Sequence, residues 1–312
     1  MKVRILVTGG AGFIGSNICR VLVRRETKVL VLDNFSTGKE ENLAKIHNQV
    51  GIIKADITDL KTVHKVVQNV DYVLHQAALP SVPRSVKDPL SSNQANVVGT
   101  LNILLAARDA GVKRVIYASS SSVYGDSPLL PKKEDLNPAP LSPYAVSKLT
   151  GEYYCQVFYS VYGLETVVLR YFNVFGPHQD PTSLYAAVIP KFIQAMLKGE
   201  APTIYGDGEQ SRDFTYVDNV VQANILALET KDAAGKILNI ACGERTKISG
   251  LVSSLNKILG SKIKPSFAPP RPGDVKHSVA SISLAKKVLG YQPQISIEEG
   301  LERTVEWHKN SP

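Results

Sequence analysis

The stretch Val3-Arg4-Ile5-Leu6-Val7-Thr8-Gly9-Gly10-Ala11-Gly12-Phe13-Ile14-Gly15 decides how this chain begins to fold. It is an apolar strand that runs into a glycine-rich turn and then into a predicted helix. We interpret Gly9 as the tight turn, Gly12 as the point where phosphates approach the backbone, and Gly15 as the close contact between helix and strand. A side chain at any of the three would intrude. The stretch therefore predicts a dinucleotide-binding site.

The residues that follow indicate which dinucleotide is bound. After a helix to about Arg25, a second apolar run, Val29 to Leu32, ends in Asp33. An acid at this distance from the glycines accepts hydrogen bonds from the adenosine ribose and repels a 2′-phosphate. The next residues, Asn34 and Phe35, offer no arginine to bind such a phosphate. We therefore expect NAD rather than NADP.

The bulk composition is that of an ordinary globular protein. The chain has 312 residues, of which 44% are hydrophobic and 21% charged, so it can form one large or two modest domains with an ample core. It has no run of 18 apolar residues, and it begins directly with a strand rather than a signal sequence. We expect a cytoplasmic protein that does not enter membranes. The three cysteines, Cys19, Cys155 and Cys242, are interpreted as small buried hydrophobes.

The charged residues argue for a small anionic substrate. The formal net charge is +8, but lysine and arginine are scattered along the chain, which does not favour nucleic acid as a partner. A basic surface is enough to attract a small anion. The six histidines show no metal-ligand spacing, and His75, at a strand end, is interpreted as a structural residue. No metal is expected.

Strands and helices alternate through the first half of the chain, which predicts an α/β fold with a Rossmann-type, doubly wound parallel sheet. Further strands are expected at 50–55, 71–75, 113–118 and 166–170, with helices near 60–67, 96–110 and 144–162. Asp56 follows the third strand, where it could meet the adenine amine or could cap the helix before Leu60. The sequence leaves both roles open.

The alternation loosens after residue 172, where segments rich in proline, glycine and aromatic residues appear. We expect a dinucleotide-binding domain over 1–172, completed by about 213–242, where a helix (217–228) and a strand (237–241) are predicted. Residues 173–212 and 243–312 are then expected to form a smaller substrate-binding region.

The candidate catalytic residues follow the strand at 113–118. A serine cluster, Ser119 to Ser122, comes first, and a later helix carries Tyr144 and Lys148. Residues four apart on a helix lie on one face, so these two side chains are neighbours. A free tyrosine titrates near pH ~10, but a neighbouring ammonium and an oxidised nicotinamide both favour the phenolate. Such a tyrosine can exchange a proton with a substrate hydroxyl.

With these residues in view, the chain resembles the extended short-chain dehydrogenases/reductases, and more narrowly the NAD-dependent UDP-hexose 4-epimerases. The resemblance spans almost the whole chain. It rests on Thr8 to Gly15, Asp33-Asn34, Asp56, Ser120 to Tyr124, Tyr144 to Lys148, Arg170 to Pro177, Ser211 to Phe214 and Arg271 to Asp274.

The resemblance implies a hydride shuttle at C4 of the sugar. Tyr144 would remove the proton of the 4-hydroxyl while the C4 hydride passes to NAD, and the keto-sugar would turn over before hydride returns to its other face. Lys148 would bind the nicotinamide ribose and keep Tyr144 ionised, and Ser120 would hydrogen-bond the reacting oxygen. The nucleotide would supply the binding energy, since the hexose has to rotate.

The resemblance also implies two sets of binding residues. Arginine presents a planar fork that matches phosphate oxygens, which suits it to the diphosphate of a UDP-sugar. The expected cofactor-binding residues are Gly9, Gly12, Phe13, Ile14, Gly15, Asp33, Asn34, Asp56, Ile57, Tyr144 and Lys148. The expected substrate-binding residues are Ser81, Ser120, Ser121, Tyr144, Asn173, Gln179, Arg212, Arg271, Asp274 and Ser278.

The sugar itself is less closely specified. Ser278 stands where a bulky tyrosine, in relatives, restricts the site to UDP-glucose and UDP-galactose, so a serine leaves room for an acetamido group. Ser81 to Ser85 and His178 to Asp180 resemble the N-acetylhexosamine 4-epimerases, although those tend to have glycine at the position of Pro80. A small pocket residue accepts the smaller hexoses too, so dual specificity is expected.

Relatives with other reactions give the alternatives. Sugar-nucleotide 4,6-dehydratases carry an Asp-Glu pair where this chain has Ser121-Ser122, which disfavours elimination of water. UDP-glucuronate 4-epimerases and decarboxylases stay open, and so does a non-catalytic sensor of NAD or nucleotide sugars. By the same resemblance, the helices at 96–110 and 144–162 would pair with their copies in a homodimer.

Overall fold

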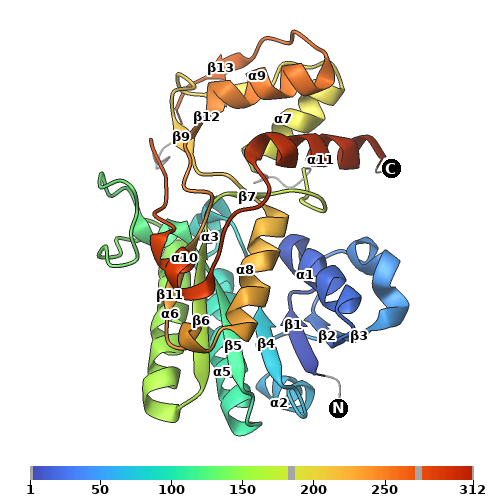
Figure 1. Cartoon of the computed structure of the whole chain (residues 1–312), viewed down its shortest axis with the longest axis vertical. Coiled ribbons are helices and arrows are strands. Elements are labelled where there is room, and N and C mark those ends of the chain that lie inside the picture. Colours follow the sequence, from blue (N-terminus) through green and yellow to red (C-terminus); the bar gives the residue numbers. More distant parts are fainter. Residues whose placement is uncertain (1–2, 182–186, 271–275, 311–312) are drawn as a thin grey trace.

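The computed structural model describes residues 3–181, 187–270 and 276–310. Its centre is a seven-stranded, fully parallel sheet in the order β11-β6-β5-β4-β1-β2-β3 (Figure 1). The order reverses between β1 and β4, and ligands of such sheets bind at the carboxyl ends of the strands beside this point. The strands are β1 (Arg4–Thr8), β2 (Lys28–Asp33), β3 (Val50–Lys54), β4 (Tyr72–His75), β5 (Arg114–Ser120), β6 (Glu165–Tyr171) and β11 (Ile237–Ile240).

The interiors of the central strands are mostly apolar, as expected where both faces of a sheet are covered. Consecutive side chains of a strand point to opposite faces. Leu6 accordingly lies in a core formed with α2 (Leu60–Val66), α5 (Gly99–Asp109) and α6 (Pro143–Tyr162). Its neighbour Val7 lies in a second core, formed with α1 (Phe13–Arg24) and α8 (Val217–Glu229). The doubly wound α/β fold predicted from the sequence is confirmed.

Capping residues explain where helices α6 and α2 begin. Ser142 caps α6 by accepting a hydrogen bond from the Ala145 amide (3.1 Å), Pro143 occupies the first turn, and Gly163 ends the helix with φ +70°. Asp59 caps α2 by accepting from the Thr62 amide, so the alternative role of Asp56 as that cap is wrong.

The helix expected at 96–110 begins earlier than its hydrophobic pattern indicates. It consists of α4 (Pro89–Asn93), a π-helical turn η2 (Gln94–Val98) and α5. Asp88 caps this composite helix by accepting from the Ser91 amide, and Pro89 follows directly. The polar residues of the first two turns hide this start from a hydrophobic-periodicity analysis.

The remaining elements follow in chain order. Between the strands and helices already given lie η1 (Glu40–Gln49), α3 (Val82–Lys87), η3 (Ser121–Tyr124) and η4 (Lys231–Ala233). In the described ranges, a smaller part of the molecule, in the upper half of Figure 1, contains three helices and two short strand pairs. These are α7 (Val188–Leu197), α9 (Ile248–Leu259), α11 (Ile297–Asn310), β8 (Thr203–Tyr205) with β13 (Ser266–Ala268), and β9 (Ser211–Arg212) with β12 (Thr246–Lys247).

The chain crosses between the sheet and the smaller part through a short parallel pair, β7 (Val174–Phe175) with β10 (Thr215–Tyr216). It then returns to the sheet as α8 and β11, the helix and strand expected near 217–228 and 237–241. The last helix beside the sheet, α10 (Ser283–Leu289), packs against β11. Within the described residues, no helix is long and apolar enough to span a membrane.

The cysteines and His75 have the surroundings of structural residues. Cys19 and Cys155 are buried, Cys242 is partly buried, and all three are free thiols, the pKa of each being raised by burial. The His75 ring bonds Thr8 Oγ1 through Nδ1 (2.7 Å) and Thr100 Oγ1 through Nε2 (2.9 Å). These contacts confirm the interpretation of His75 as a hydrogen-bonded structural residue.

We expect His75 to make the fold sensitive to acid. Burial lowers its pKa from 6.5 to about 3, so between these values the unfolded chain binds a proton that the folded chain does not. The free energy of unfolding should therefore fall as the pH drops from 6.5 towards 3, by up to about 1.4 kcal/mol per pH unit from this residue. Urea unfolding at pH 5 and pH 7 should show a smaller difference for His75→Gln than for the wild type. An equal difference in both proteins would contradict this prediction.

Candidate functional site

The glycine-rich turn has the geometry expected of each glycine. Gly9 has φ +67°, and a Cβ there would lie 2.7 Å from Ala77 Cα. A Cβ on Gly15 would lie 2.1 Å from Gly9 O, so the start of α1 touches the turn directly. At Gly12 a Cβ would meet Gly9 O at 3.2 Å and no other atom of the described residues within 4 Å. The space beside Gly12 is the gap through which a diphosphate could approach.

The first turn of α1 can receive an anion. Its N-cap residue, Gly12, has no side chain to bond the first amides, and the turn contains no acidic residue. Phe13 and Ile14 occupy its first two positions and are partly buried. Helix N-termini of this kind bind phosphate through their backbone N–H groups and the helix dipole. The residues present therefore fit the diphosphate of NAD.

Three predicted adenosine contacts lie together at the ends of β2 and β3. Asp33 is buried, which raises its pKa, and its carboxylate accepts from the amides of Ala11 (2.9 Å) and Phe35 (2.8 Å). Asn34 Nδ2 donates to Asp56 Oδ2 (2.6 Å). The structure thus brings Asp33, Asn34 and Asp56 into one polar group. The Ile57 side chain instead points into the core against Gly99, which leaves only its backbone for a cofactor.

Ser120, Tyr144 and Lys148 converge where β5 ends and α6 begins. Burial raises the pKa of Tyr144, and a hydrogen bond with the Ser120 hydroxyl opposes this rise. The Lys148 ammonium is buried, donates to the Ala118 carbonyl (2.8 Å) and lies 5.1 Å from the centre of the Tyr117 ring. Burial lowers the pKa of Lys148 to about 8. Burial therefore disfavours the charged forms of both side chains, the phenolate of Tyr144 and the ammonium of Lys148.

Two residues that were not predicted to support the site hold α6 in place. The Ser85 hydroxyl accepts a hydrogen bond from the Tyr144 amide (3.0 Å). Asn96, buried in the π-helical turn, donates to Ser147 Oγ (3.0 Å) and accepts from the Leu79 amide (2.8 Å). A π-helical turn has no sequence signature, so no local pattern could have assigned Asn96 to the site.

A buried ion pair joins the same helix to the sheet. Glu152, one turn after Lys148, receives two hydrogen bonds from Arg170 on β6 (2.9 and 2.7 Å) and a third from Ser119 on β5. Both partners are almost fully buried. Since a paired charge in the core has few alternative arrangements, this pair fixes α6 against β6, and the Ser119 bond holds it against β5 beside Ser120.

A cavity of about 250 Å³ opens beside the carboxyl end of the sheet, in the smaller part of the molecule. The predicted substrate residues Asn173 and Arg212 both line it. Gln179 is adjacent, because its Nε2 donates to the Val174 carbonyl (3.1 Å). Most of the lining was not predicted and comes from separate segments: Val174, Phe175, Ala187, Val188, Ile189, Phe192, Thr203, Ile204, Tyr205, Gln210, Phe214 and Ile248.

The other predicted substrate residues lie around these groups. Ser81 caps α3 with φ +109°, a backbone conformation that a residue with a side chain rarely adopts. Ser121 begins η3, directly after Ser120. The Ser278 amide donates to the Ser211 carbonyl (3.0 Å), which places Ser278 beside the strand of Arg212. Arg271 and Asp274 lie outside the described residues.

A doubly wound sheet with a glycine-rich turn and a Ser-Tyr-Lys group at its carboxyl edge defines a nicotinamide-dependent enzyme of the extended short-chain dehydrogenase/reductase type. Residues 5–241 match the model of the NAD dependent epimerase/dehydratase family. The chain belongs to this family, and NAD is its cofactor.

Solved structures of UDP-sugar 4-epimerases are similar over nearly the whole chain. A UDP-N-acetylglucosamine 4-epimerase from Methanobrevibacter ruminantium, in complex with UDP-N-acetylmuramic acid, is 46% identical with a TM-score of 0.95, covering 99% of both chains. The UDP-glucose 4-epimerase of Thermotoga maritima, with UDP-glucose, is 40% identical (TM-score 0.94; 98% of this chain and 99% of that one). A UDP-glucuronic acid 4-epimerase from Bacillus cereus, with its substrate and NAD, is 36% identical (TM-score 0.91; 98% and 99%).

Proposed function

We propose that this protein inverts C4 of UDP-hexoses, converting UDP-glucose and UDP-galactose into one another, and likewise UDP-N-acetylglucosamine and UDP-N-acetylgalactosamine. The observation that carries the proposal is the convergence of Ser120, Tyr144 and Lys148 at the carboxyl edge of the sheet. The similarity to 4-epimerases of both sugar classes supports both substrates.

In this proposal Tyr144 exchanges the proton of the sugar 4-hydroxyl, with Ser120 bonded to the same oxygen. Lys148 stabilises the phenolate by its charge, because a neighbouring cation favours the ionised form of tyrosine. NAD, when bound, supplies the acceptor for the C4 hydride. Asp33, Asn34 and Asp56 hold the adenosine end, while Gly12, Phe13 and Ile14 leave room and amides for the diphosphate.

The substrate is proposed to lie across two parts of the chain. Residues 1–172, completed by 213–242, form the dinucleotide-binding part, and residues 173–212 and 243–312 bind the nucleotide sugar. The cavity beside Asn173 suits the uridine, and Arg212 suits the diphosphate because a guanidinium can bond two phosphate oxygens at once. Ser81, Ser121, Gln179, Arg271, Asp274 and Ser278 complete the proposed set.

Arg212 gives a direct test of the binding site. We expect Arg212→Gln to raise the KM for UDP-glucose about 10- to 100-fold, since the variant loses hydrogen bonds from a charged donor to the diphosphate. The value of kcat should change much less, because Arg212 is remote from the reacting carbon in this proposal. Steady-state kinetics with Arg212→Lys as the matched control, which keeps the charge, should give an intermediate KM. An unchanged KM in Arg212→Gln would remove the residue from the site.

Uronic acid chemistry is the second candidate. The 36% identity to a UDP-glucuronic acid 4-epimerase over nearly the full chain favours it as an alternative substrate class on the same catalytic groups. A non-catalytic sensor is disfavoured, because a sensor needs no tyrosine beside a buried lysine at the nicotinamide end.

The substrate is established by incubating the purified protein separately with UDP-glucose, UDP-N-acetylglucosamine and UDP-glucuronic acid, and following the C4 epimers by proton NMR. Conversion of the first two confirms dual specificity, and conversion of one of them alone assigns the sugar. Conversion of UDP-glucuronic acid alone would assign the second candidate function, epimerisation of uronic acids. If none is converted after NAD has been added, the proposed epimerase function is wrong.

We also propose a homodimer through α5 and α6. Three apolar side chains on α6, Val146, Tyr153 and Val157, are 50%, 54% and 46% exposed and lie on one stripe of the helix. A second copy would cover this stripe in a four-helix arrangement. Analytical ultracentrifugation should show a dimer, and Val157→Glu should shift it towards monomer. A wild-type monomer at micromolar concentration would exclude this assembly.

A further inference from the structure

The segment Pro177 to Asp180 follows residues that line the cavity, and it contacts α1 and the residues after β2. Asn17 Nδ2, on α1, donates to the Pro177 carbonyl (3.1 Å). Lys39 forms an ion pair with Asp180 (3.3 Å). The proposed reaction uses neither contact. Both connect the substrate-binding part of the chain with the elements that surround the glycine-rich turn.

Asn42 is the centre of this contact. It is buried, its Nδ2 donates to the Ala11 carbonyl in the glycine-rich turn (2.8 Å), and its Oδ1 bonds His178 Nδ1 (3.1 Å). Because the amide nitrogen is used at Ala11, the amide oxygen is the acceptor, so His178 Nδ1 carries the hydrogen. One side chain therefore bonds the turn on one side and the substrate-binding part on the other.

The backbone of Ala11 is hydrogen-bonded through both its carbonyl and its amide. Its carbonyl also accepts from the Lys39 amide (3.0 Å), and the Ala11 amide donates to Asp33 Oδ2 (2.9 Å). Since a peptide unit is planar, a fixed Ala11 carbonyl also fixes the direction of the Gly12 N–H and of the chain entering α1. The Gly12 N–H itself donates to the Gly9 carbonyl (3.1 Å), so the amides that fit the diphosphate of NAD are those of the first turn of α1.

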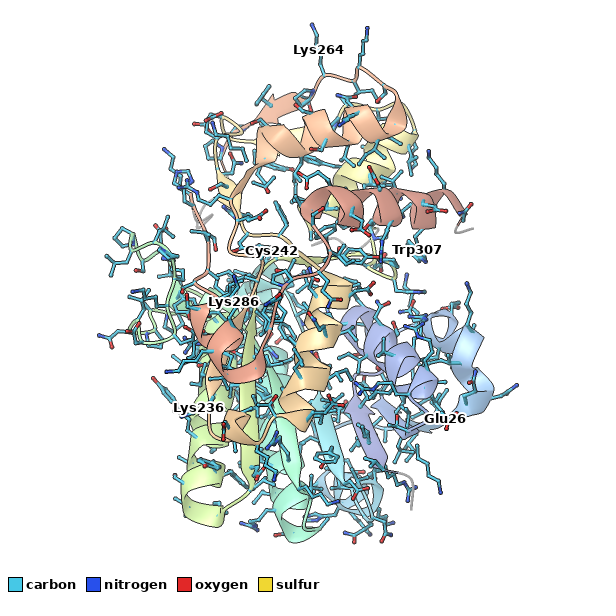
Figure 2. The ribbon with its side chains drawn as sticks, in the orientation of Figure 1. Glu26, Lys236, Cys242, Lys264, Lys286 and Trp307 are labelled. Carbon is cyan, nitrogen blue, oxygen red and sulfur yellow. The ribbon has the colours of Figure 1, made fainter. Side chains whose placement is uncertain are left out.

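His178 is held firmly on its other side. Its ring centre lies 5.0 Å from that of Trp307, the only tryptophan of the chain, and its backbone has φ +72°. Figure 2 shows Trp307 on the lower side of α11, facing the region above α1. Because the ring is already packed, His178 loses little rotamer freedom when it donates to Asn42. The net free energy of this hydrogen bond is therefore more favourable.

We propose that Asn42 and His178 are positioning residues for the NAD site: together they form a latch through which the substrate-binding part of the chain holds the glycine-rich turn in its NAD-binding shape. Breaking the latch should weaken the retention of NAD, although neither side chain need touch the cofactor. The inference depends on NAD as the cofactor and not on the identity of the sugar.

The positive φ of His178 allows a substitution that does not strain the backbone. Glycine adopts φ +72° freely, so His178→Gly removes the ring and the donor without straining the chain. Asparagine also tolerates positive φ, and its amide can donate, so His178→Asn is the conservative rescue. Arg25→Gln is the matched control, because it breaks an ion pair between the far end of α1 and Glu229 on α8.

The experiment measures the dissociation constant of NAD by isothermal titration calorimetry on protein stripped of cofactor, with the thermal unfolding midpoint of each stripped protein beside it. We expect His178→Gly to raise the dissociation constant about three- to tenfold, as the loss of one partly buried hydrogen bond predicts. His178→Asn should recover most of the affinity, and Arg25→Gln should match the wild type.

Three results would overturn the latch. The first is wild-type NAD affinity in His178→Gly. The second is no recovery in His178→Asn, because the bond to Asn42 would then not be the cause. The third is an equal loss in Arg25→Gln, or a loss that follows the unfolding midpoints, because this would indicate general loosening of the fold.

Discussion

Replacing Tyr144 by phenylalanine should lower kcat for C4 epimerisation by about 100- to 10,000-fold, the contribution typical of a positioned acid–base group. The substitution removes one oxygen from a residue whose hydroxyl bonds Ser120 and leaves the ring in its place on α6. The rate is measured by NMR of the C4 epimers at saturating UDP-sugar and NAD.

Tyr144→Phe should still bind its ligands. The dissociation constants of NAD and UDP should stay within a few-fold of the wild type, because the phenol contacts neither the adenosine pocket nor the cavity beside Arg212. Tyr159→Phe, on the same helix but 41% exposed, is the matched control and should keep full activity. If Tyr144→Phe retained normal turnover, the assignment of Tyr144 as the proton-transfer group would be wrong.

The second large effect is expected at the glycine-rich turn. A Cβ on Gly15 would lie 2.1 Å from Gly9 O and 2.8 Å from Gly10 Cα, so α1 would have to move away from β1. Because both contacts are with backbone, Gly15→Ala should cost at least about 1–3 kcal/mol of unfolding free energy and abolish measurable NAD binding. Urea unfolding and calorimetric titration with NAD report the two effects.

Gly12→Ala is the matched partner of that variant. At Gly12 the added methyl group would meet Gly9 O at 3.2 Å, and the backbone conformation (φ −77°, ψ 177°) is open to alanine. We expect a loss of stability of no more than about 1 kcal/mol, from the poorer N-cap, together with a large loss of NAD affinity. Unaltered NAD affinity in Gly12→Ala would show that the diphosphate does not pass this residue.

Much of the cofactor half of the site could be predicted because it is local in sequence. The turn, the acid that ends β2 and the helix between them form one continuous βαβ unit, so spacing alone places Asp33 near Gly9. The Tyr144 and Lys148 pair is local in the same sense, since both residues lie on α6. In each case the geometry of one or two regular elements determines the distance.

The substrate half could not be predicted in the same way. The cavity is assembled from five elements, β7, α7, β8, β9 and α9, which are spread along the chain from Val174 to Leu259, and no periodicity indicates which of their side chains meet. Asn96 and Ser85 were not predicted to support the site for a related reason. Each supports α6 from another element, Asn96 through a π-helical turn that hydrophobic patterning does not show.

The amino-acid sequence by itself determined the class of fold and the preference for NAD, and it led to the proton-transfer residues that we propose, because each depends on contacts between neighbours in a strand, turn or helix. Tertiary structure alone decided that Asp59 rather than Asp56 caps α2, that Glu152 and Arg170 fix α6 to the sheet, and that Asn42 joins the glycine-rich turn to His178. These contacts unite distant segments, and only the packing of both faces of the sheet brings such segments within hydrogen-bond distance.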